Sequence, residues 1–320
     1  VLPCGRSPLF AHSGWDLKPA LLSNNMPPEL IVAGVLALDN LKTPHGEGTK
    51  IVGGAGVYSS VAASIFTETA IVAAIGNDFP VEFMDEIKSR NISVQSVKEL
   101  DYPTFHWSGE YVGDMSQAIT HATDFQINEH YDWEIANEQR KSKTLLLCNN
   151  DPNIQSKILD QMDAEITAMD TMNLWIDIER KKLNEVVSRI DILFINDAEA
   201  QLYSGLKNLD DAANDLLQKG PKYVIVKKGE HGASLYTKDT CEHRVAFLVK
   251  DFIDPTGAGD TFGGALISAL ACGKTLTDSL IYGSSLASLC VEGFGSDKIQ
   301  KVSESTIEER VNFLQSTVKP

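Results

Sequence analysis

The sequence has no apolar run long enough to cross a bilayer, and it carries an excess of negative charge. Its longest apolar stretches fall short of the roughly 20 residues that a membrane-spanning helix needs. There are 28 Lys and Arg residues against 44 Asp and Glu residues, which gives a net charge of −16. Binding to a phosphate backbone normally requires a basic face. We therefore expect neither a membrane nor a nucleic acid among the partners.

Cysteine is scarce as well, and its pattern excludes two kinds of site. The five cysteines are odd in number and include no C-x-x-C pair, so neither a disulfide framework nor a zinc site is indicated. Three of them stand in apolar runs, as core residues do, which fits a reducing compartment and predicts a cytoplasmic protein. The five are Cys4, Cys148, Cys241, Cys272 and Cys290.

Two common nucleotide-binding motifs are missing. The stretch GGAGVY does not fit G-x-G-x-x-G, and no G-x-x-x-x-G-K-[ST] occurs anywhere in the chain. The sequence therefore supports neither a Rossmann dinucleotide site nor a P-loop, and an anionic ligand would have to be held in another way.

Short apolar runs rich in Val, Ile and Leu alternate with amphipathic stretches from residue 29 onward. Continuous apolar strands that alternate with helices indicate an α/β fold, with a mainly parallel central sheet and helices on both faces. The runs expected to be strands read ELIVAGVLAL, TAIVAAIG, TLLLC, LWIDI, DILFIN and KYVIVKKG. The first 28 residues lack this pattern and lack the charged start and apolar centre of a signal peptide. We expect residues 1–28 to be a leader, non-native or disordered, and residues 29–318 to form one domain.

Residues from about 94 to 129 interrupt the alternation. The stretch TFHWSGEYV places Phe105, Trp107 and Tyr111 on one face of a strand and polar side chains on the other. This period of two predicts a small β-sheet flap with an aromatic face, which is either an edge hairpin packed on the body or a lid over a ligand. The strand could also pair with a second copy, which leaves a homodimer through the lid open.

The most specific stretch is DPTGAGDTFGG, residues 254–264, which stands just before a helix-like run. Glycine permits close approach of the backbone to a ligand, and the amides at a helix N-terminus attract an anion. Asp260 falls in the first turn of the predicted helix. The stretch therefore predicts an anion site with a carboxylate base beside it.

Several other motifs accompany this stretch: GVLALDN, VGGAGVYSS, INDAEA, KKGEHGA and EGFGSDK. In this order and spacing, the set resembles the ribokinase-like, or PfkB, family of carbohydrate kinases over about residues 30–313. The chain looks most like a bacterial sugar-kinase subgroup of that family, through GG-x-x-x-Y and DTMN-x-W. The resemblance implies a ribokinase-like fold with a small β-sheet lid. It also implies an enzyme that transfers the γ-phosphate of ATP to a hydroxyl of a sugar or sugar derivative.

The resemblance assigns the catalytic chemistry to the DPTGAGD stretch. Asp260 matches the general base that takes the proton of the acceptor hydroxyl. The amides expected to form the anion hole belong to Gly257, Ala258 and Gly259.

The resemblance also implies ATP and Mg²⁺ as cofactors. Asn196 and Glu199 match an N-x-x-E motif that helps to hold Mg²⁺ through its water shell. Asp254 and Thr256 match positions around a monovalent cation, usually K⁺. The residues expected at the nucleotide and its metal are Asn196, Glu199, Lys227, Gly229, Gly232, Thr256, Gly293 and Gly295.

On the acceptor side, Asp39 offers two oxygens that suit a pair of adjacent hydroxyls. Tyr58 departs from the pattern of the family, because many of its members carry Asn at this position. The resemblance therefore does not imply the usual acceptors, ribose or fructose. For Asp170 a second interpretation stays open, in which it is a residue at the end of a strand whose side chain stabilises a turn. The residues expected to contact the acceptor are Asp39, Gly53, Gly54, Tyr58, Trp107 and Asp170.

Two alternatives stay open at the level of the sequence. One is a nucleoside kinase of the same family, in which the lid aromatics would stack on an adenosine-like or inosine-like base. The other is a non-catalytic ribokinase-like protein that binds or regulates, although retention of the Asp260 carboxylate argues against it.

Overall fold

The computed structural model describes residues 27–115 and 117–318. Within these ranges a nine-stranded sheet has the order β13-β12-β11-β10-β9-β8-β1-β4-β5. Every neighbouring pair is parallel except those at the β11-β12-β13 edge, which are antiparallel. The strands are β1 (Leu30–Ala33), β4 (Thr69–Gly76), β5 (Ile92–Leu100), β8 (Thr144–Leu147), β9 (Ile166–Asp170), β10 (Ile192–Asn196), β11 (Tyr223–Lys227), β12 (Ala233–Tyr236) and β13 (Cys241–Arg244). The predicted α/β class is confirmed, while residues 1–26 of the expected leader lie outside the described ranges.

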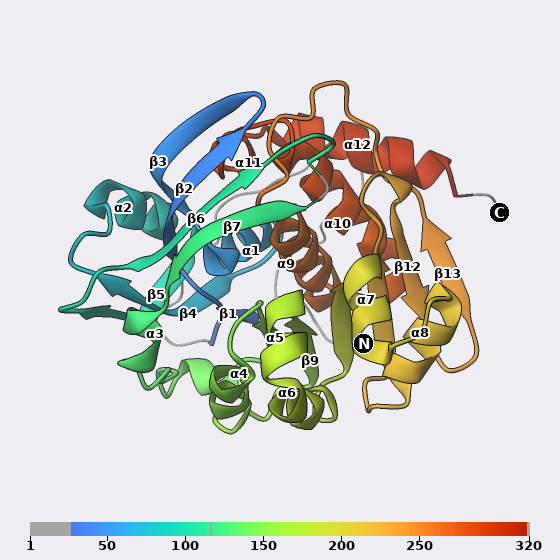
Figure 1. The fold of residues 1–320 in the computed structure, drawn as a ribbon, viewed down its shortest axis with the longest axis horizontal. Coiled ribbons are helices and arrows are strands. Elements are labelled where there is room, and N and C mark those ends of the chain that lie inside the picture. Colours follow the sequence, from blue (N-terminus) through green and yellow to red (C-terminus); the bar gives the residue numbers. More distant parts are fainter. Residues whose placement is uncertain (1–26, 116, 319–320) are drawn as a thin grey trace.

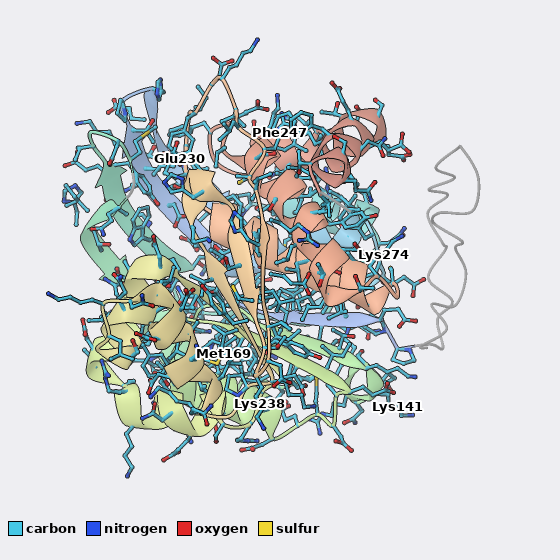
Figure 2. All side chains as sticks on the ribbon, turned by 90° about the vertical axis from the view of Figure 1, so that its right-hand side faces the viewer. Lys141, Met169, Glu230, Lys238, Phe247 and Lys274 are labelled. Carbon is cyan, nitrogen blue, oxygen red and sulfur yellow. The ribbon has the colours of Figure 1, made fainter. Side chains whose placement is uncertain are left out.

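Helices cover both faces of this sheet, because the central strands are apolar on both sides. All eight residues of β4 are buried, for example. One core cluster joins the sheet to α4, α6, α7 and α8, and two others join it to α1, α9, α10 and α12 (Figure 1). Met169 of β9, which is fully buried in the first cluster, is labelled in Figure 2. The helices are α1 (Ala55–Ser64), α2 (Val81–Ser89), α3 (Gln126–Glu129), α4 (Pro152–Leu159), α5 (Asn173–Ile178), α6 (Arg180–Val187), α7 (Asp197–Ser204), α8 (Leu209–Leu217), α9 (Ala258–Ala271), α10 (Leu276–Cys290), α11 (Asp297–Gln300) and α12 (Glu304–Ser316).

One of the expected strands is wrong. The run LWIDI lies in α5, and the strand of this region is the preceding segment ITAMD, which forms β9. A short apolar run does not distinguish a strand from a buried helical turn by its periodicity. Here only Trp175 and Ile176 of α5 are buried, as expected for one side of a short helix.

A second sheet forms the lid, with the strand order β3-β2-β6-β7. Its strands are β2 (Ala37–Thr43), β3 (Gly46–Gly53), β6 (Phe105–Tyr111) and β7 (Ala118–Asp124). β2 pairs parallel with β6, while the two outer pairs are antiparallel. Residues 37–53 thus contribute half of the lid, and β5 belongs to the edge of the central sheet (Figure 1). Among the residues described, no helix is both long and apolar enough to cross a membrane.

Candidate active site

Three polar residues stand side by side where neighbouring strands of the central sheet end. Asp170 ends β9, Asn196 ends β10 and Lys227 ends β11. The register pairs Asp170 with Phe194 and Asn196 with Lys227, so all three lie at the carboxyl edge of the sheet. Open α/β sheets bind ligands at this edge.

Lys227 and Asp170 form an ion pair whose nitrogen and oxygen are 2.5 Å apart. Asp170 is only 6% exposed and Lys227 is partly buried. Burial alone would lower the pKa of Lys227, but the carboxylates of Asp170 and Glu199 outweigh it, and the pKa lies above its usual value. The lysine therefore keeps its positive charge at the point where the two strands end.

Asn196 and Glu199 form a capping box at the start of α7. The Asn196 side-chain oxygen accepts from the Glu199 amide at 2.7 Å, and a Glu199 oxygen accepts from the Asn196 amide at 3.0 Å. Burial, with Asp170 adding to it and Lys227 opposing it, raises the pKa of Glu199 to about 7. The cap occupies one oxygen of Glu199 and leaves the other for a further partner.

The glycine-rich stretch turns sharply before α9. Gly257 is the N-cap residue of the helix and has a φ of 73°, a left-handed conformation that favours glycine. The Asp254 carboxylate supports the turn, because it accepts from the Thr256 amide at 2.9 Å and from the Gly295 amide at 2.8 Å. The amide of Ala258 donates to the Pro255 carbonyl at 3.2 Å. Gly259 and Asp260 lie in the first turn of the helix, where backbone amides have no carbonyl of a preceding turn as a hydrogen-bond acceptor. Such amides can bind an anion.

Asp260 lies in the first turn of α9, as the sequence predicts. Burial, together with the nearby Asp170 carboxylate and against the Lys227 charge, raises its pKa to about 6. A Cβ atom on Gly259 would stand 3.1 Å from the Lys227 nitrogen, which places the ammonium beside the same turn. A carboxylate and a cation thus flank the backbone amides of one helix N-terminus.

Asp39 faces this turn from the lid strand β2 and is 5% exposed. Burial and the neighbouring carboxylates Asp254 and Asp260 raise its pKa to about 7, while the backbone amides of Gly54 and Trp107 donate to it and partly oppose the shift. A Cβ atom on Gly53 would come within 2.4 Å of an Asp39 oxygen, so glycine makes room for the carboxylate.

Tyr58 lies on α1 beneath the turn and is 2% exposed. A Cβ atom on Gly257 would meet the Tyr58 ring at 2.3 Å, so the ring packs directly against the turn. Contact of Tyr58 with an acceptor stays a prediction.

The lid presents aromatic side chains on the same face as Asp39. Trp107 is the register partner of Asp39, and its indole nitrogen donates to the Thr120 hydroxyl at 3.1 Å. Burial raises the pKa of Tyr111 to about 12; a hydrogen bond with the Thr256 side chain opposes the shift, and the charges of Asp254, Asp260 and Asp39 add to it. Tyr111 therefore lies near these three carboxylates.

The remaining predicted residues lie on two loops. Gly229 starts the 3₁₀ turn after β11 and Gly232 follows that turn, with φ values of 54° and 85°. Gly293 and Gly295 lie between α10 and α11, and the amide of Gly295 reaches Asp254. A nucleotide contact at these glycines stays a prediction.

Sequence reasoning missed two supporting residues. The Ser59 hydroxyl donates to the Asp260 carbonyl at 3.0 Å and so ties α1 to the first turn of α9. Gly109 lies under the Trp107 indole, because a Cβ atom there would come within 2.3 Å of the ring. The alternation of β6 (Phe105–Tyr111) puts Gly109 on the same face as Trp107, but it does not show which neighbour covers the glycine.

A pocket of about 410 Å³ lies on the other face of the lid, between the lid and the turn after β4. Leu38, Asn40 and His106 line it, and these residues alternate with Asp39 and Trp107 along their strands. The pocket is therefore not part of the site around Asp260.

Comparison with known proteins places this chain in a family. The model of the pfkB family carbohydrate kinases matches residues 29–301. A cytidine kinase from Thermococcus kodakarensis is 27% identical over 261 residues, which cover 80% of this chain and 93% of that protein. The structure of a nucleoside kinase from Methanocaldococcus jannaschii, an archaeal member of the ribokinase family, has a TM-score of 0.74 at 22% identity and covers 90% of this chain and 99% of its own. An Arabidopsis thaliana ribokinase complexed with ribose and ATP has a TM-score of 0.73 at 21% identity and covers 90% and 100%.

These structures share the fold described above, with its mainly parallel sheet between helices and its small lid. Because the family match covers most of the sequence, the chain belongs to the pfkB family of carbohydrate kinases.

Proposed function

We propose that this kinase transfers the γ-phosphate of ATP to a hydroxyl of a sugar or sugar derivative. One observation carries the proposal: Asp260 lies in the first turn of α9, and the Lys227 ammonium of the sheet edge lies beside the same turn. The buried lid carboxylate Asp39 is near enough for the charge of Asp260 to raise its pKa. A carboxylate, a cation and a polar group of the lid thus lie near a turn whose amides can receive an anion.

The residues then divide the chemistry among them. Asp260 takes the proton of the acceptor hydroxyl, the hydroxyl oxygen bonds to the γ-phosphorus, and the bond to the β-phosphate oxygen breaks to release ADP. The Gly257–Asp260 turn and Lys227 stabilise the negative charge on the transferred group, because phosphoryl transfer depends mainly on positioning and charge neutralisation. The nucleotide lies along the loops that contain Gly229 and Gly293.

Asn196 and Glu199 fit a role at Mg²⁺. The capping box fixes both side chains and leaves one Glu199 oxygen free to accept from a water of the ion. Mg²⁺ keeps several waters and prefers oxygen ligands, and when bound it would neutralise phosphate charge. A monovalent cation beside Asp254 and Thr256 belongs to the same proposal, although both Asp254 oxygens already accept a backbone amide.

The acceptor lies between the face of the lid that presents Asp39 and the turn before α9. The two oxygens of Asp39 suit a pair of adjacent hydroxyls, which ribose and nucleosides both carry. The Trp107 indole lies on the same face as Asp39 and offers a flat surface to a sugar C–H face or to a base. We favour a sugar or sugar derivative other than plain ribose. A nucleoside is the second candidate, supported by the indole and by the similarity to cytidine and nucleoside kinases.

Three further parts of the proposal concern the whole chain. Residues 29–318 form one domain. Cys148, Cys241 and Cys290 are free cysteines, which suits a cytoplasmic location. A homodimer through the lid would cover Val112 and Ile119, which are exposed at the lid.

The test is an ADP-release assay with ATP and Mg²⁺ across pentoses, hexoses, sugar acids, polyols and nucleosides. We expect turnover with a hydroxyl-rich acceptor, and a loss of roughly 10²–10⁴-fold in Asp260→Asn, because that variant lacks the general base. Asp39→Ala should selectively lower kcat/KM for acceptors that carry adjacent hydroxyls. Absence of turnover with every acceptor, while ATP still binds, would favour the non-catalytic alternative. Ribose as the best acceptor, or Asp39→Ala without effect, would contradict the acceptor site.

A further inference from the structure

Arg310 of α12 is a buried cation that the chemistry above does not use. It is 8% exposed, although an arginine is normally left at the surface unless its charge is paired. One guanidinium nitrogen donates to a Glu292 oxygen at 2.6 Å, and the other donates to the Ser288 hydroxyl at 2.8 Å. The helix therefore holds the end of α10 and the second residue after it.

The same guanidinium also contacts a second loop. Its central carbon lies 4.5 Å from the centre of the Phe247 ring, in the segment between β13 and α9. The Phe247 ring in turn packs edge-on against Phe313, three residues after Arg310, with ring centres 5.2 Å apart. Figure 2, in which Phe247 is labelled, shows this segment passing beside the C-terminal helices.

These two loops lead directly into the candidate nucleotide site. Glu292 precedes Gly293 and Gly295, and the Gly295 amide donates to Asp254. The Phe247 segment continues to Ile253, whose amide donates to the Val291 carbonyl at 2.8 Å, and then to the anion-binding turn. Arg310 therefore connects the Glu292 loop, along which the nucleotide is proposed to lie, to the segment that leads into the anion-binding turn.

We propose that Arg310 is a positioning residue for the nucleotide: it fixes the Glu292 loop and the Phe247 segment at the separation that ATP and ADP require. This inference rests on the proposed function. The physical basis of the inference is the number of contacts that the guanidinium makes. It donates one hydrogen bond to a carboxylate and one to a hydroxyl, and it packs on an aromatic ring, so that it holds all three groups in place. Removal of the arginine leaves the Glu292 carboxylate without its cation, and the loop would then move toward water.

The test compares Arg310→Met with Arg310→Lys and with a matched control, Arg180→Met. Arg180 is also a helical arginine. It donates to three backbone carbonyls, those of Ile176, Tyr203 and Leu202, and lies 5.7 Å from the Tyr203 ring, but none of these contacts involves the two loops. For each variant we measure the Kd for ADP by calorimetry, and kcat and the KM values for ATP and for the acceptor by the ADP-release assay. Thermal unfolding reports the loss of stability.

We expect Arg310→Met to raise the ADP Kd and the ATP KM roughly tenfold, which corresponds to about 1.4 kcal/mol, with kcat and the acceptor KM little changed. Arg310→Lys should recover part of the loss, and Arg180→Met should lower the unfolding temperature without raising the ADP Kd. If Arg310→Met does not fold, Glu292→Gln replaces it with the same expected direction. Unchanged ADP affinity, or an equal rise in Arg180→Met, overturns the inference. If the wild-type protein neither binds ADP nor turns over ATP, the proposed function itself is wrong, and the inference fails with it.

Discussion

At the scale of single residues, the site concentrates negative charge that the fold does not neutralise. The pKa of Asp260 is raised to about 6 and those of Asp39 and Glu199 to about 7, with burial the largest cause in each case. Lys227 opposes the shift at Asp260 and Glu199, but it also pairs with Asp170. Sites that hold groups with such raised pKa values are often functional, because a base with a pKa near the working pH transfers protons well.

The pH dependence of kcat/KM follows from these pKa values. Asp260 must be ionised to accept the proton of the acceptor, so kcat/KM should be highest above about pH 7 and fall as pH drops through about 6. Protonation of Asp39 and Glu199, whose pKa values are about 7, should make the decrease steeper than a single ionisation gives. A profile measured from pH 5 to pH 9 at saturating Mg²⁺ checks this. A flat profile down to pH 5 would contradict the role of Asp260 as base.

At the scale of elements, helix starts and lid strands place these groups. The capping box aims Glu199 from α7, and the turn before α9 rests on the Tyr58 ring of α1. The sequence could predict that Asn196 and Glu199 act together, because their spacing of three fits one helical turn. It could not predict that the Tyr58 ring lies beneath Gly257, because the two residues are about 200 positions apart and only tertiary packing brings them together.

The capping box gives a prediction about metal dependence. In Glu199→Gln, the amide oxygen can still accept from the Asn196 backbone, so the helix cap and the unfolding temperature should be retained. The charge that would orient the waters of Mg²⁺ is lost, and second-shell changes of this kind typically cost about 10–100-fold in metal affinity or activity. We expect a rise of about that size in the Mg²⁺ concentration at half-maximal rate, measured by titration of the ADP-release assay. An unchanged Mg²⁺ requirement would exclude Glu199 from the metal site.

The lid gives a prediction about the acceptor. In Gly109→Ala, the new methyl group would occupy the space of the Trp107 indole, which must then move away from the acceptor face. We expect a rise of several-fold in the acceptor KM and a change in the preference among acceptors, with the ATP KM unchanged. Gly46→Ala is the control, because this glycine is also in a lid strand and the nearest atom to its added methyl group would be 3.9 Å away. Equal effects in the two variants would show that the indole does not select the acceptor.

At the scale of the whole molecule, the alternation of parallel strands and helices could be predicted, because central strands such as β4 are continuously apolar and helices such as α8 are amphipathic. The division between the central sheet and the lid could not be predicted, because β2 joins the lid through its pairing with β6, and β3 through its pairing with β2. The run LWIDI was misread because burial on one side of a short helix resembles a short strand. The contacts of Arg310 had no sequence signal either, since they join three segments that are distant in the chain.

The raised carboxyl pKa values also predict how the stability of the whole molecule depends on pH. A carboxyl group whose folded pKa exceeds its unfolded value binds more protons in the folded state between those two values, so its contribution to stability falls as pH rises across that interval. For Asp260 the interval runs from its ordinary value of 3.8 to about 6, and for Asp39 from 3.8 to about 7. Above pH 7 both are ionised, and the folded state bears the full cost of their buried charge.

Replacing Asp260 by Asn removes this cost at neutral pH but not at acidic pH, where the wild-type carboxyl is already protonated. We therefore expect Asp260→Asn to unfold at a higher temperature than the wild type at pH 7.5, by roughly 2–4 °C for each kcal/mol recovered, and at nearly the same temperature at pH 4. Asp197→Asn is the matched control, because Asp197 is an exposed carboxylate in the first turn of α7. Thermal unfolding of the three proteins at several pH values without ligand measures the effect. An Asp260→Asn protein less stable than the wild type at pH 7.5 would mean that contacts of the ionised carboxylate outweigh the cost of its burial. The same variant should lose roughly 10²–10⁴-fold in turnover, because the charge that weakens the fold is the base that the reaction needs.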